Sequence, residues 1–307
     1  MTVEKIPEDE LHTLRDWVRW SASCFNRNQL YYGHGTDNAL DEALELVLAT
    51  LQLDHDLPES YLDARVSRDE AGLLAERVLR RVEQRVPLAY VTGRAYFAGL
   101  EFIVDENVLV PRSPIAELIL GGFQPWLGDV QVNSVLDLCC GSGCIGIACA
   151  YAFPEALVDL ADISPSALDV ASRNIDKHGL DDRVRAIHSD VFDGLDEERY
   201  DLIVSNPPYV SSAEMATLPQ EYHQEPVLGL EAGADGMDVV SRILAGAADY
   251  LTPGGILVAE VGASADLLMA RYPDVPFLWI DFEHGGDGVF MLTADQLAEY
   301  RDIFLED

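Results

Sequence analysis

Three stretches near the start of the chain place apolar residues at helical spacing. They cover residues 11–25, 40–53 and 73–86. Because residues three or four positions apart share one face of a helix, each stretch predicts an amphipathic helix. Asp37 and Ser67 are the candidate N-caps of the second and third helices. The pattern therefore predicts a small helical domain over residues 1–86.

The pattern changes at Pro87. Strand-like runs at residues 96–104 and 108–110 lie on either side of a predicted turn at residues 105–107. A helix is expected to begin at Ser113 and to end at Leu120. Glycine, proline and aspartate then become frequent, as is typical of a joint between domains. We therefore predict a hairpin and a linker over residues 87–132.

Strands and helices alternate in the rest of the chain. The predicted strands cover residues 135–138, 157–162, 184–188, 201–205 and 255–261, and the predicted helices lie around residues 145–151 and 165–178. Such alternation indicates a parallel sheet with helices on both faces. Two final strand-like runs, 275–282 and 289–292, flank a glycine-rich turn. Residues 133–307 are therefore predicted to form an α/β domain whose parallel sheet ends in an antiparallel edge pair.

A glycine-rich loop follows the first predicted strand of this domain, in Asp137-Leu138-Cys139-Cys140-Gly141-Ser142-Gly143-Cys144-Ile145-Gly146. Gly141 and Gly143 allow the backbone to approach a ligand where a Cβ atom would clash. Asp162 ends the next strand, where a carboxylate can accept hydrogen bonds from both hydroxyls of a ribose. The combination predicts an adenosine-containing cofactor. Since Gly141-x-Gly143-x-x-Gly146 also matches the dinucleotide fingerprint, this loop alone leaves nicotinamide and S-adenosylmethionine cofactors open.

A second motif, Asn206-Pro207-Pro208-Tyr209, follows a buried strand. Proline fixes φ and donates no backbone hydrogen bond, so the Asn206 side chain and the Pro207 carbonyl can be held as rigid acceptors. An amide or aryl amino nitrogen is planar, and its delocalised lone pair makes it a poor nucleophile. Two acceptors that grip its N–H bonds would orient it and raise its electron density, while Tyr209 packs on the planar group. The motif predicts methyl transfer from S-adenosylmethionine to such a nitrogen.

The charge balance narrows the class of partner. The 307-residue chain has 54 acidic and 20 basic residues, a formal net charge of −34 at pH 7. A protein that follows a phosphate backbone needs clustered Lys and Arg, so this balance disfavours nucleic acid as a direct substrate and favours a basic protein. Solubility in a salty cytoplasm would also require an acidic, lysine-poor surface, and both explanations stay open.

The cysteines and the apolar runs bear on the kind of site and on location. The five cysteines are Cys24, Cys139, Cys140, Cys144 and Cys149. Their odd number indicates reduced thiols, and no nearby histidine has ligand spacing, so no metal site is predicted. No run approaches the roughly 18 uncharged apolar residues that a bilayer requires, and the acidic, amphipathic start is unlike a secretory signal. We expect a cytoplasmic protein with no membrane partner.

Three other functions stay open on these residues. The first is a nucleic-acid amino methyltransferase, against which the acidic charge counts. The second is a nicotinamide-dependent dehydrogenase, against which the Asn206-Pro207-Pro208-Tyr209 motif counts. The third is a ribosome assembly factor that only binds, which two intact loops disfavour.

The chain resembles a known family, the glutamine N5-methyltransferases that act on translation proteins. It is most similar to the branch that modifies a glutamine of large-subunit ribosomal protein three. Besides the two loops, the resemblance rests on Tyr32-Gly33-His34-Gly35-Thr36-Asp37-Asn38, Pro87-Leu88-Ala89-Tyr90, Leu109-Val110-Pro111-Arg112-Ser113-Pro114 and Glu225-Pro226. The related release-factor branch carries Arg-Pro-Asp or Arg-Pro-Glu where this chain has Arg112-Ser113-Pro114, which favours the ribosomal-protein branch.

The resemblance implies a fold, a cofactor and a set of site residues. The fold is the class I S-adenosylmethionine methyltransferase fold, a Rossmann-like seven-stranded sheet with a C-terminal antiparallel hairpin, preceded by a helical substrate-recognition domain. Cofactor contacts are implied for Asp137, Cys139, Cys140, Gly141, Ser142, Gly143, Asp162, Asp190, Val191 and Asn206. Catalytic roles are implied for Asn206, Pro207 and Tyr209, and substrate contacts for Asn206, Pro207, Pro208, Tyr209, Arg112 and Glu225. The implied substrate is the side-chain amide of a glutamine, with a release factor as the alternative to the ribosomal protein.

Overall fold

The computed structural model describes residues 6–128 and 131–306. The chain divides into two compact units. The first contains the chain up to residue 95 together with residues 219–224, and the second contains the remainder. In the described part of the chain, no helix is both long enough and apolar enough to cross a bilayer.

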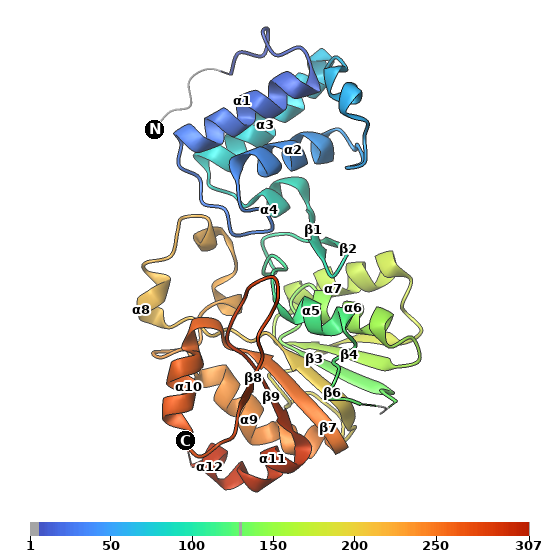
Figure 1. Cartoon of the computed structure of the whole chain (residues 1–307), viewed down its shortest axis with the longest axis vertical. Coiled ribbons are helices and arrows are strands. Elements are labelled where there is room, and N and C mark those ends of the chain that lie inside the picture. The colour runs from blue at the N-terminus through green and yellow to red at the C-terminus, as the bar shows by residue number, and fades with distance from the viewer. Residues whose placement is uncertain (1–5, 129–130, 307) are drawn as a thin grey trace. The chain divides into compact units, whose positions relative to one another are not determined.

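The first unit is helical, as predicted (Figure 1). Its elements are α1 (Leu14–Arg27), α2 (Ala39–Thr50), the 3-10 turn η1 (Glu59–Asp63), α3 (Arg68–Glu83) and α4 (Leu88–Thr92). Ser67 caps α3 as predicted, in a capping box with Glu70. The prediction of Asp37 as the N-cap of α2 is wrong. Asn38 takes that position because its side-chain oxygen accepts from the backbone of Leu40 and Asp41.

A buried ionic network joins residues 219–224 to the helices of this unit. Arg81 is almost fully buried and pairs with Glu42 and, at 3.4 Å, with Glu221. The carboxylate of Glu221 also lies 3.2 Å from Arg85 and accepts a hydrogen bond from the backbone N–H of Tyr31 at 3.0 Å. Burial by itself would raise the pKa of Glu221, but these hydrogen bonds and positive charges lower it. A buried charge needs such partners, so Glu221 is an integral part of the helical unit.

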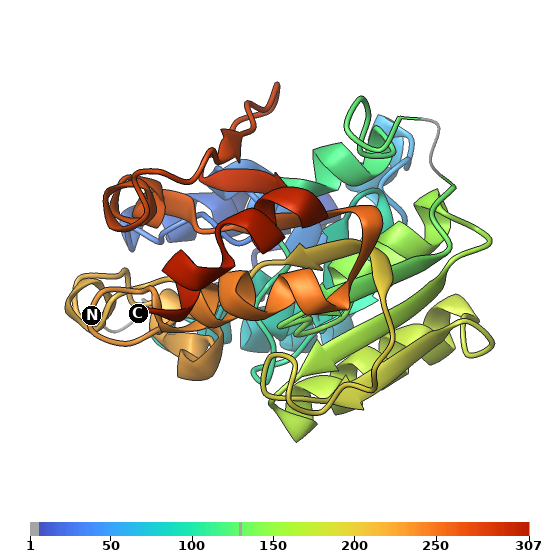
Figure 2. The same cartoon turned by 90° about the horizontal axis from the view of Figure 1, so that it is seen from below.

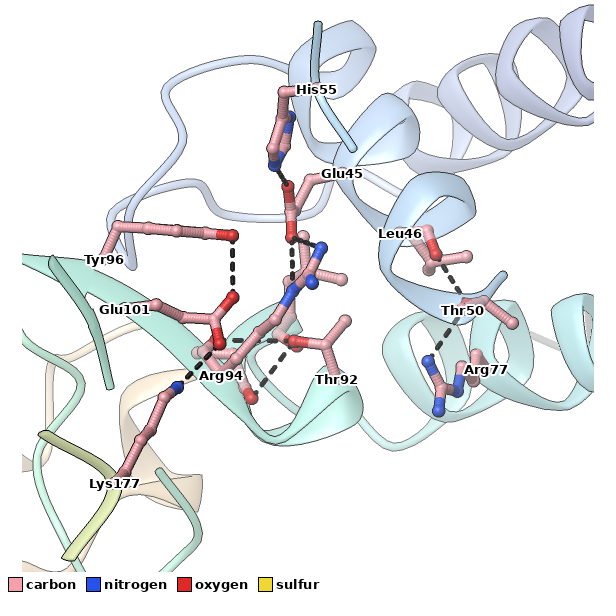
Figure 3. A network of polar contacts seen from close by, with 12 residues as sticks. Glu45, Leu46, Thr50, His55, Arg77, Thr92, Arg94, Tyr96, Glu101 and Lys177 are labelled. Atoms are coloured by element: carbon pink, nitrogen blue, oxygen red, sulfur yellow. Dashed lines mark hydrogen bonds and ion pairs between the residues drawn. The ribbon is translucent and has the colours of Figure 1, made fainter. Parts of the chain in front are cut away.

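Figure 3 shows a second polar network, at the end of α2. Glu45 lies between His55, whose Nε2 is 2.8 Å from Glu45 Oε2, and Arg94, whose Nη2 is 3.0 Å from Glu45 Oε1. Thr50 donates to the carbonyl of Leu46 and accepts a hydrogen bond from Arg77. His55 is half-exposed, while Glu45 and Arg94 are partly buried; ion pairs this close to the surface contribute about 1 kcal/mol or less each.

The hairpin lies earlier in the chain than predicted. Strands β1 (Arg94–Phe97) and β2 (Leu100–Ile103) form a two-stranded sheet, and their turn falls at Ala98-Gly99, both of which have positive φ. Such a two-residue turn matches the twist of paired strands. The predicted turn at residues 105–107 is present, with the Val108 N–H donating to the Asp105 carbonyl at 3.2 Å, but the strand predicted at 108–110 is absent and the hairpin does not form around this turn.

Strand β2 is attached to α7 (Pro165–His178) in the second unit. Asn174, which is fully buried, accepts from the backbone N–H of Ile103 at 2.7 Å and donates to its carbonyl at 3.0 Å. Glu101 accepts from Lys177 Nζ at 2.6 Å and from the hydroxyl of Tyr96 at 2.9 Å, as Figure 3 shows. Specific hydrogen bonds thus hold β2 against α7 within the second unit.

The second unit is built on a seven-stranded sheet in the order β5-β4-β3-β6-β7-β9-β8. The strands are β3 (Ser134–Leu138), β4 (Leu157–Asp162), β5 (Val184–His188), β6 (Tyr200–Ser205), β7 (Leu251–Glu260), β8 (Leu278–Trp279) and β9 (Val289–Thr293). The first five in spatial order are parallel, and β9 is antiparallel to both β7 and β8. The predicted parallel sheet with an antiparallel edge pair is confirmed.

Helices cover both faces of this sheet (Figures 1 and 2). On one face lie α5 (Ile115–Leu120), α6 (Cys144–Ala152) and α7, and on the other α9 (Asp238–Tyr250), α11 (Ala294–Glu299) and α12 (Arg301–Leu305); the short helices α8 (Ser212–Met215) and α10 (Ala265–Arg271) complete the unit. Alternate residues of β3 serve the two cores, Val135 on the α6 side and Leu136 on the α9 side. The chain leaves β3 for β4 on one side and later places β6 on the other, which creates a switch point where ligands bind in such sheets.

Candidate active site

A cavity of about 390 Å³ opens at the carboxyl ends of the central parallel strands, and every residue that lines it belongs to the second unit. This volume lies in the range of roughly 300–1,000 Å³ that is usual for small-molecule sites. Its walls come from residues 106–113, the loop after β3, the residues after β4 and β5, Asn206 and Pro208 after β6, and Pro226, Leu228, Gly229, Val239 and Arg242. The cavity therefore lies at the switch point of the sheet.

The glycine-rich loop forms one wall of the cavity. A glycine is needed at each of its three glycine positions, for packing in two of them and for a different structural reason in the third. Gly143 begins α6 with φ of +77°, and a Cβ atom there would lie 2.8 Å from Leu160 Cδ1. At Gly146 a Cβ atom would lie 2.2 Å from Leu160 Cδ2, so both glycines allow α6 to pack closely on β4. Gly141 has φ of +53°, and nothing lies within 4 Å of the position its Cβ would take. Its backbone therefore faces the open cavity, where a ligand can approach it.

Two non-glycine residues that line the cavity have strained backbones. Cys139 has φ of +59° and Val191 has φ of +55°. Left-handed φ is unfavourable for any residue with a Cβ atom, and more so for a β-branched one; each such residue costs about 1–3 kcal/mol. The surrounding structure holds both residues in place, one after β3 and the other after β5. Strain of this kind concentrates at ligand sites.

Asp162, at the end of β4, fixes the loop from the opposite side. Its Oδ2 accepts from the backbone N–H of Gly141 at 2.9 Å, and its Oδ1 accepts from Ser164 at 2.9 Å. Burial raises the pKa of Asp162, while the hydrogen bonds from Ser164 and Gly141 oppose that rise. Each carboxylate oxygen keeps a second lone-pair position. The aspartate therefore fits two neighbouring hydroxyls, the donor pair of a ribose.

Asp190 and Val191 line the far end of the cavity, together with a residue that the sequence did not single out. Arg242, on α9, donates from Nη1 to Asp190 Oδ1 at 2.7 Å and from Nη2 to the Asp190 carbonyl at 3.3 Å. The hydrogen bond with Asp190 raises the pKa of Arg242. The arginine thus fixes the orientation of the carboxylate beside the cavity.

The loop after β6 forms the wall next to the glycine-rich loop. Asn206 and Pro208 line the cavity, whereas Pro207 is buried and Tyr209 is half-buried behind them. The hydroxyl of Tyr209 donates to Glu260 Oε1 at 2.9 Å. The loop brings Asn206, a residue with a side-chain amide, to the cavity wall, and its two prolines have no backbone N–H.

Arg112 and Glu225 form a bidentate ion pair. Nη1 and Nη2 of Arg112 lie 2.6 and 2.8 Å from the two carboxylate oxygens of Glu225, which also accepts from the backbone N–H of Val110 at 3.0 Å. Arg112 lines the cavity, and Glu225 lies behind it with a fully buried side chain. This bond pairs the backbone N–H of Val110 with a side chain, and residues 108–110 do not form the strand expected there.

Five of the predicted site residues do not line the cavity. They are Asp137, Gly143, Pro207, Tyr209 and Glu225. Asp137 is fully buried beneath the loop, where its Oδ2 accepts from Gly146 N at 2.8 Å and its Oδ1 has no partner among the described residues. Burial raises the pKa of Asp137 to about 8. The position of Asp137 suits it to support the loop from below.

Sequence reasoning missed several lining residues. These include Glu106, Asn107, Leu109, Ile163, Ser189 and Arg242. It also missed Asn174, whose side-chain amide donates to the Ser142 carbonyl at 2.9 Å and so holds the glycine-rich loop. Ile163 and Ser189 directly follow predicted strands, which was a usable signal. Asn174 and Arg242 lie within helices, where no local signal marks a residue as part of a site.

The cysteines around the cavity are free thiols. Burial raises the pKa of Cys139, Cys140, Cys144 and Cys149, so these thiols are protonated and weakly nucleophilic at neutral pH. Within residues 6–128 and 131–306, no group of three or more metal-binding side chains is placed to hold an ion.

Several known proteins are similar to this chain in sequence or in fold. Residues 123–222 match the family model described as methyltransferase small domain. The chain is 50% identical over 297 residues to the ribosomal protein uL3 glutamine methyltransferase of Francisella tularensis, covering 96% of this chain and 95% of the relative. It is 48% identical over 289 residues to the Bordetella pertussis protein of the same name, with 94% and 97% covered. The solved hMettl16 catalytic domain, in complex with an RNA hairpin, shares the fold with a TM-score of 0.50 at 16% identity, covering 76% of this chain and 84% of that one.

Proposed function

The chain belongs to the ribosomal protein uL3 glutamine methyltransferases, and on that premise we propose that it methylates the side-chain amide nitrogen of one glutamine in ribosomal protein uL3. It is an S-adenosylmethionine-dependent methyltransferase. One observation carries the choice of an amide as the target. Asn206 and Pro208 border the same cavity as the glycine-rich loop and Asp162.

Each wall of the cavity has its own proposed task. On the cofactor side, the backbone of Cys139, Cys140, Gly141 and Ser142 surrounds the methionine part of S-adenosylmethionine, Asp162 accepts from the ribose hydroxyls, and Asp190 and Val191 border the adenine. Asp137 and Gly143 support this wall from behind. When bound, S-adenosylmethionine supplies a methyl group on a positively charged sulfur, which is a strong electrophile.

On the target side, Asn206 Oδ1 and the Pro207 carbonyl accept the two N–H bonds of the substrate amide. These contacts hold its plane and direct its lone pair toward the cofactor wall. As the nitrogen forms its bond to the methyl group, the methyl–sulfur bond would break to leave S-adenosylhomocysteine, and the nitrogen would then release one N–H proton to water. Positive charge develops on the nitrogen in this step, so fixed acceptors stabilise the transition state more than the ground state. Tyr209 packs against the amide, and Arg112, held by Glu225, borders the entrance.

The substrate class rests on charge as well as on family. A net charge of −34 attracts a basic ribosomal protein and repels the phosphates of free nucleic acid. The helical unit, which includes residues 1–86, is proposed to recognise the folded substrate. Because bacterial ribosomal proteins are made and assembled in the cytoplasm, we propose that the enzyme acts there.

The test is to incubate the purified enzyme with methyl-labelled S-adenosylmethionine and ribosomal proteins from a strain that lacks it. Mass spectrometry should find a single methylglutamine, on uL3, and Asn206→Ala should abolish it. A release factor is supplied in parallel, because label there would assign the enzyme to the sister branch. Label found only on nucleic acid would overturn the proposal.

A further inference from the structure

A buried carboxylate lies directly behind the target loop, and the chemistry proposed above does not use it. Glu260 ends β7, the strand next to β6, and is 6% exposed. Its Oε1 accepts from the hydroxyl of Tyr209 at 2.9 Å, and its Oε2 accepts from the hydroxyl of Ser113 at 2.6 Å. Glu260 is absent from the cavity wall, so it does not contact a ligand there.

Each donor of this pair comes from a different motif. Tyr209 ends the Asn-Pro-Pro-Tyr loop, and Ser113 lies in the Pro111-Arg112-Ser113-Pro114 stretch, whose first three residues line the cavity. Ser113 in turn accepts from the backbone N–H of Ile115 at 3.2 Å, at the start of α5. Glu260 therefore joins two walls of the cavity through two hydroxyl groups.

The surroundings of Tyr209 leave its ring little freedom. A Cβ atom at Gly262 would lie 2.8 Å from Tyr209 Cε2, so a glycine here lets the backbone lie against the ring. The Tyr209 carbonyl accepts from Ser264 Oγ at 3.1 Å, and a Cβ atom at Gly236 would lie 2.3 Å from the same oxygen. Backbone, ring edge and hydroxyl of Tyr209 are thus each fixed by a separate contact.

We propose that Glu260 is a positioning residue for methyl transfer, which sets the plane of the Tyr209 ring through the phenol hydroxyl and ties it to Ser113. This inference rests on the proposed function, because it gives the ring the task of holding the planar target amide. Lone-pair direction decides whether an amide nitrogen can react, and a displacement of about 1 Å can lower a rate by about 100-fold. A carboxylate suits the task since it accepts from both hydroxyls at once.

The experiment compares Glu260→Ala, Glu260→Gln, Tyr209→Phe and the double variant Glu260→Ala/Tyr209→Phe. We expect Glu260→Ala and Tyr209→Phe each to lower kcat by about 30-fold while KM for the protein substrate and Kd for S-adenosylmethionine change less than about threefold. Glu260→Gln should recover most of the activity because its amide oxygen still accepts from Tyr209 and its NH₂ can donate to Ser113. The double variant should be no slower than the slower single variant, since both remove one link.

A second tyrosine–carboxylate hydrogen bond in the same sheet provides a matched control. Tyr200, at the start of β6, donates its hydroxyl to buried Asp159 at 2.7 Å, at the end of the strands away from the cavity. Tyr200→Phe removes the same kind of hydrogen bond and should lower the melting temperature without changing kcat. Fluorine NMR of 3-fluorotyrosine at position 209 reads ring order without turnover, and Glu260→Ala should broaden or split that signal.

The outcomes separate the two proposals. If the wild-type enzyme modifies no glutamine, the proposed function fails, whereas the NMR signal still tests whether Glu260 orders the ring. Normal kcat in Glu260→Ala, or rate losses that multiply in the double variant, would overturn the positioning role. A loss in Glu260→Ala that equals the loss in Tyr200→Phe would overturn it too, because general destabilisation would then explain both.

Discussion

The loops after β3 and β6 lie next to each other at the same edge of the sheet, and they are built in opposite ways. The β3 loop uses glycines at positions 141 and 143, and its backbone reaches φ values that side chains disfavour. The β6 loop uses Pro207 and Pro208, which fix the backbone and remove its donors. One loop offers a close-lying backbone with N–H groups, whereas the other contains two consecutive residues that have a carbonyl and no N–H.

This difference matches what each wall has to bind. A charged amino acid with a nucleoside attached is recognised by many backbone contacts, for which close approach matters. A single planar amide has two N–H bonds, for which rigid acceptors matter. If the two loops serve separate tasks, mutations in one should spare the task of the other.

The largest expected effect is that of Asn206→Ala. Loss of one fixed group at the reacting nitrogen should lower kcat by about 1,000-fold, as losses of single transition-state hydrogen bonds do. Kd for S-adenosylmethionine, measured by calorimetry, should rise less than about tenfold. An equal loss of cofactor affinity would break the comparison, because the two loops would then act as one.

Two glycine substitutions distinguish packing from ligand binding within the β3 loop. Gly146→Ala pushes a methyl group into Leu160 and should destabilise the fold by about 1–3 kcal/mol, measured by urea unfolding. Gly141→Ala meets open space but places a Cβ atom at φ of +53°, which costs about 1–2 kcal/mol of stability. Its methyl group should also obstruct the ligand, so we expect affinity for S-adenosylmethionine to fall in this variant and not in Gly146→Ala. Unchanged affinity in Gly141→Ala would show that the glycine serves the conformation of the loop and not the approach of the ligand.

Pro207→Ala tests the rigidity of the loop after β6. It frees φ and adds a donor, so we expect kcat to fall by about three- to tenfold with unchanged cofactor affinity; the change in the unfolded chain costs about 0.4–1 kcal/mol of stability. Single-turnover rates at saturating S-adenosylmethionine would measure this. An unchanged rate would mean that Asn206 alone orients the amide.

The smallest expected effect on the rate is at Asp137, beneath the β3 loop, whose titration instead changes the stability of the fold. Burial raises the pKa of this group from 3.8 to about 8, so the folded protein binds a proton that the unfolded chain releases. Its contribution to stability therefore falls as pH rises from about 4 to about 8. Asp137→Asn mimics the neutral acid and should raise the melting temperature relative to wild type by an amount that grows over this range. A constant difference would contradict the assignment.

The sequence was sufficient where the determining contacts are local. β4, β5 and α7 have the predicted bounds because strand alternation and the Ser164 cap with Pro165 at the helix start are short-range signals. The two loops were found for the same reason, since each directly follows a strand. Their chemical roles stay predictions until measured.

Contacts between residues far apart in the sequence could not be predicted from sequence patterns. Arg112 and Glu225 are separated by 113 residues, and Glu225 is held by geometry that no spacing rule encodes. The early hairpin turn was missed because Ala98-Gly99 is a weaker turn signal than Asp105-Glu106-Asn107, which instead borders the cavity. Arg242 was missed because an arginine on an amphipathic helix usually faces solvent.

Residues 219–224 belong to the helical unit although they lie far along the chain, and this limits how the genes of such enzymes can be recombined. A gene fusion that exchanges only the first 95 codons would separate Arg81 and Arg85 from Glu221, their buried counter-ion. Arg81 would keep only its pair with Glu42, and both arginines would lose the carboxylate of Glu221. A stable chimera is therefore expected to need both pieces of the parent gene, residues 1–95 and 219–224.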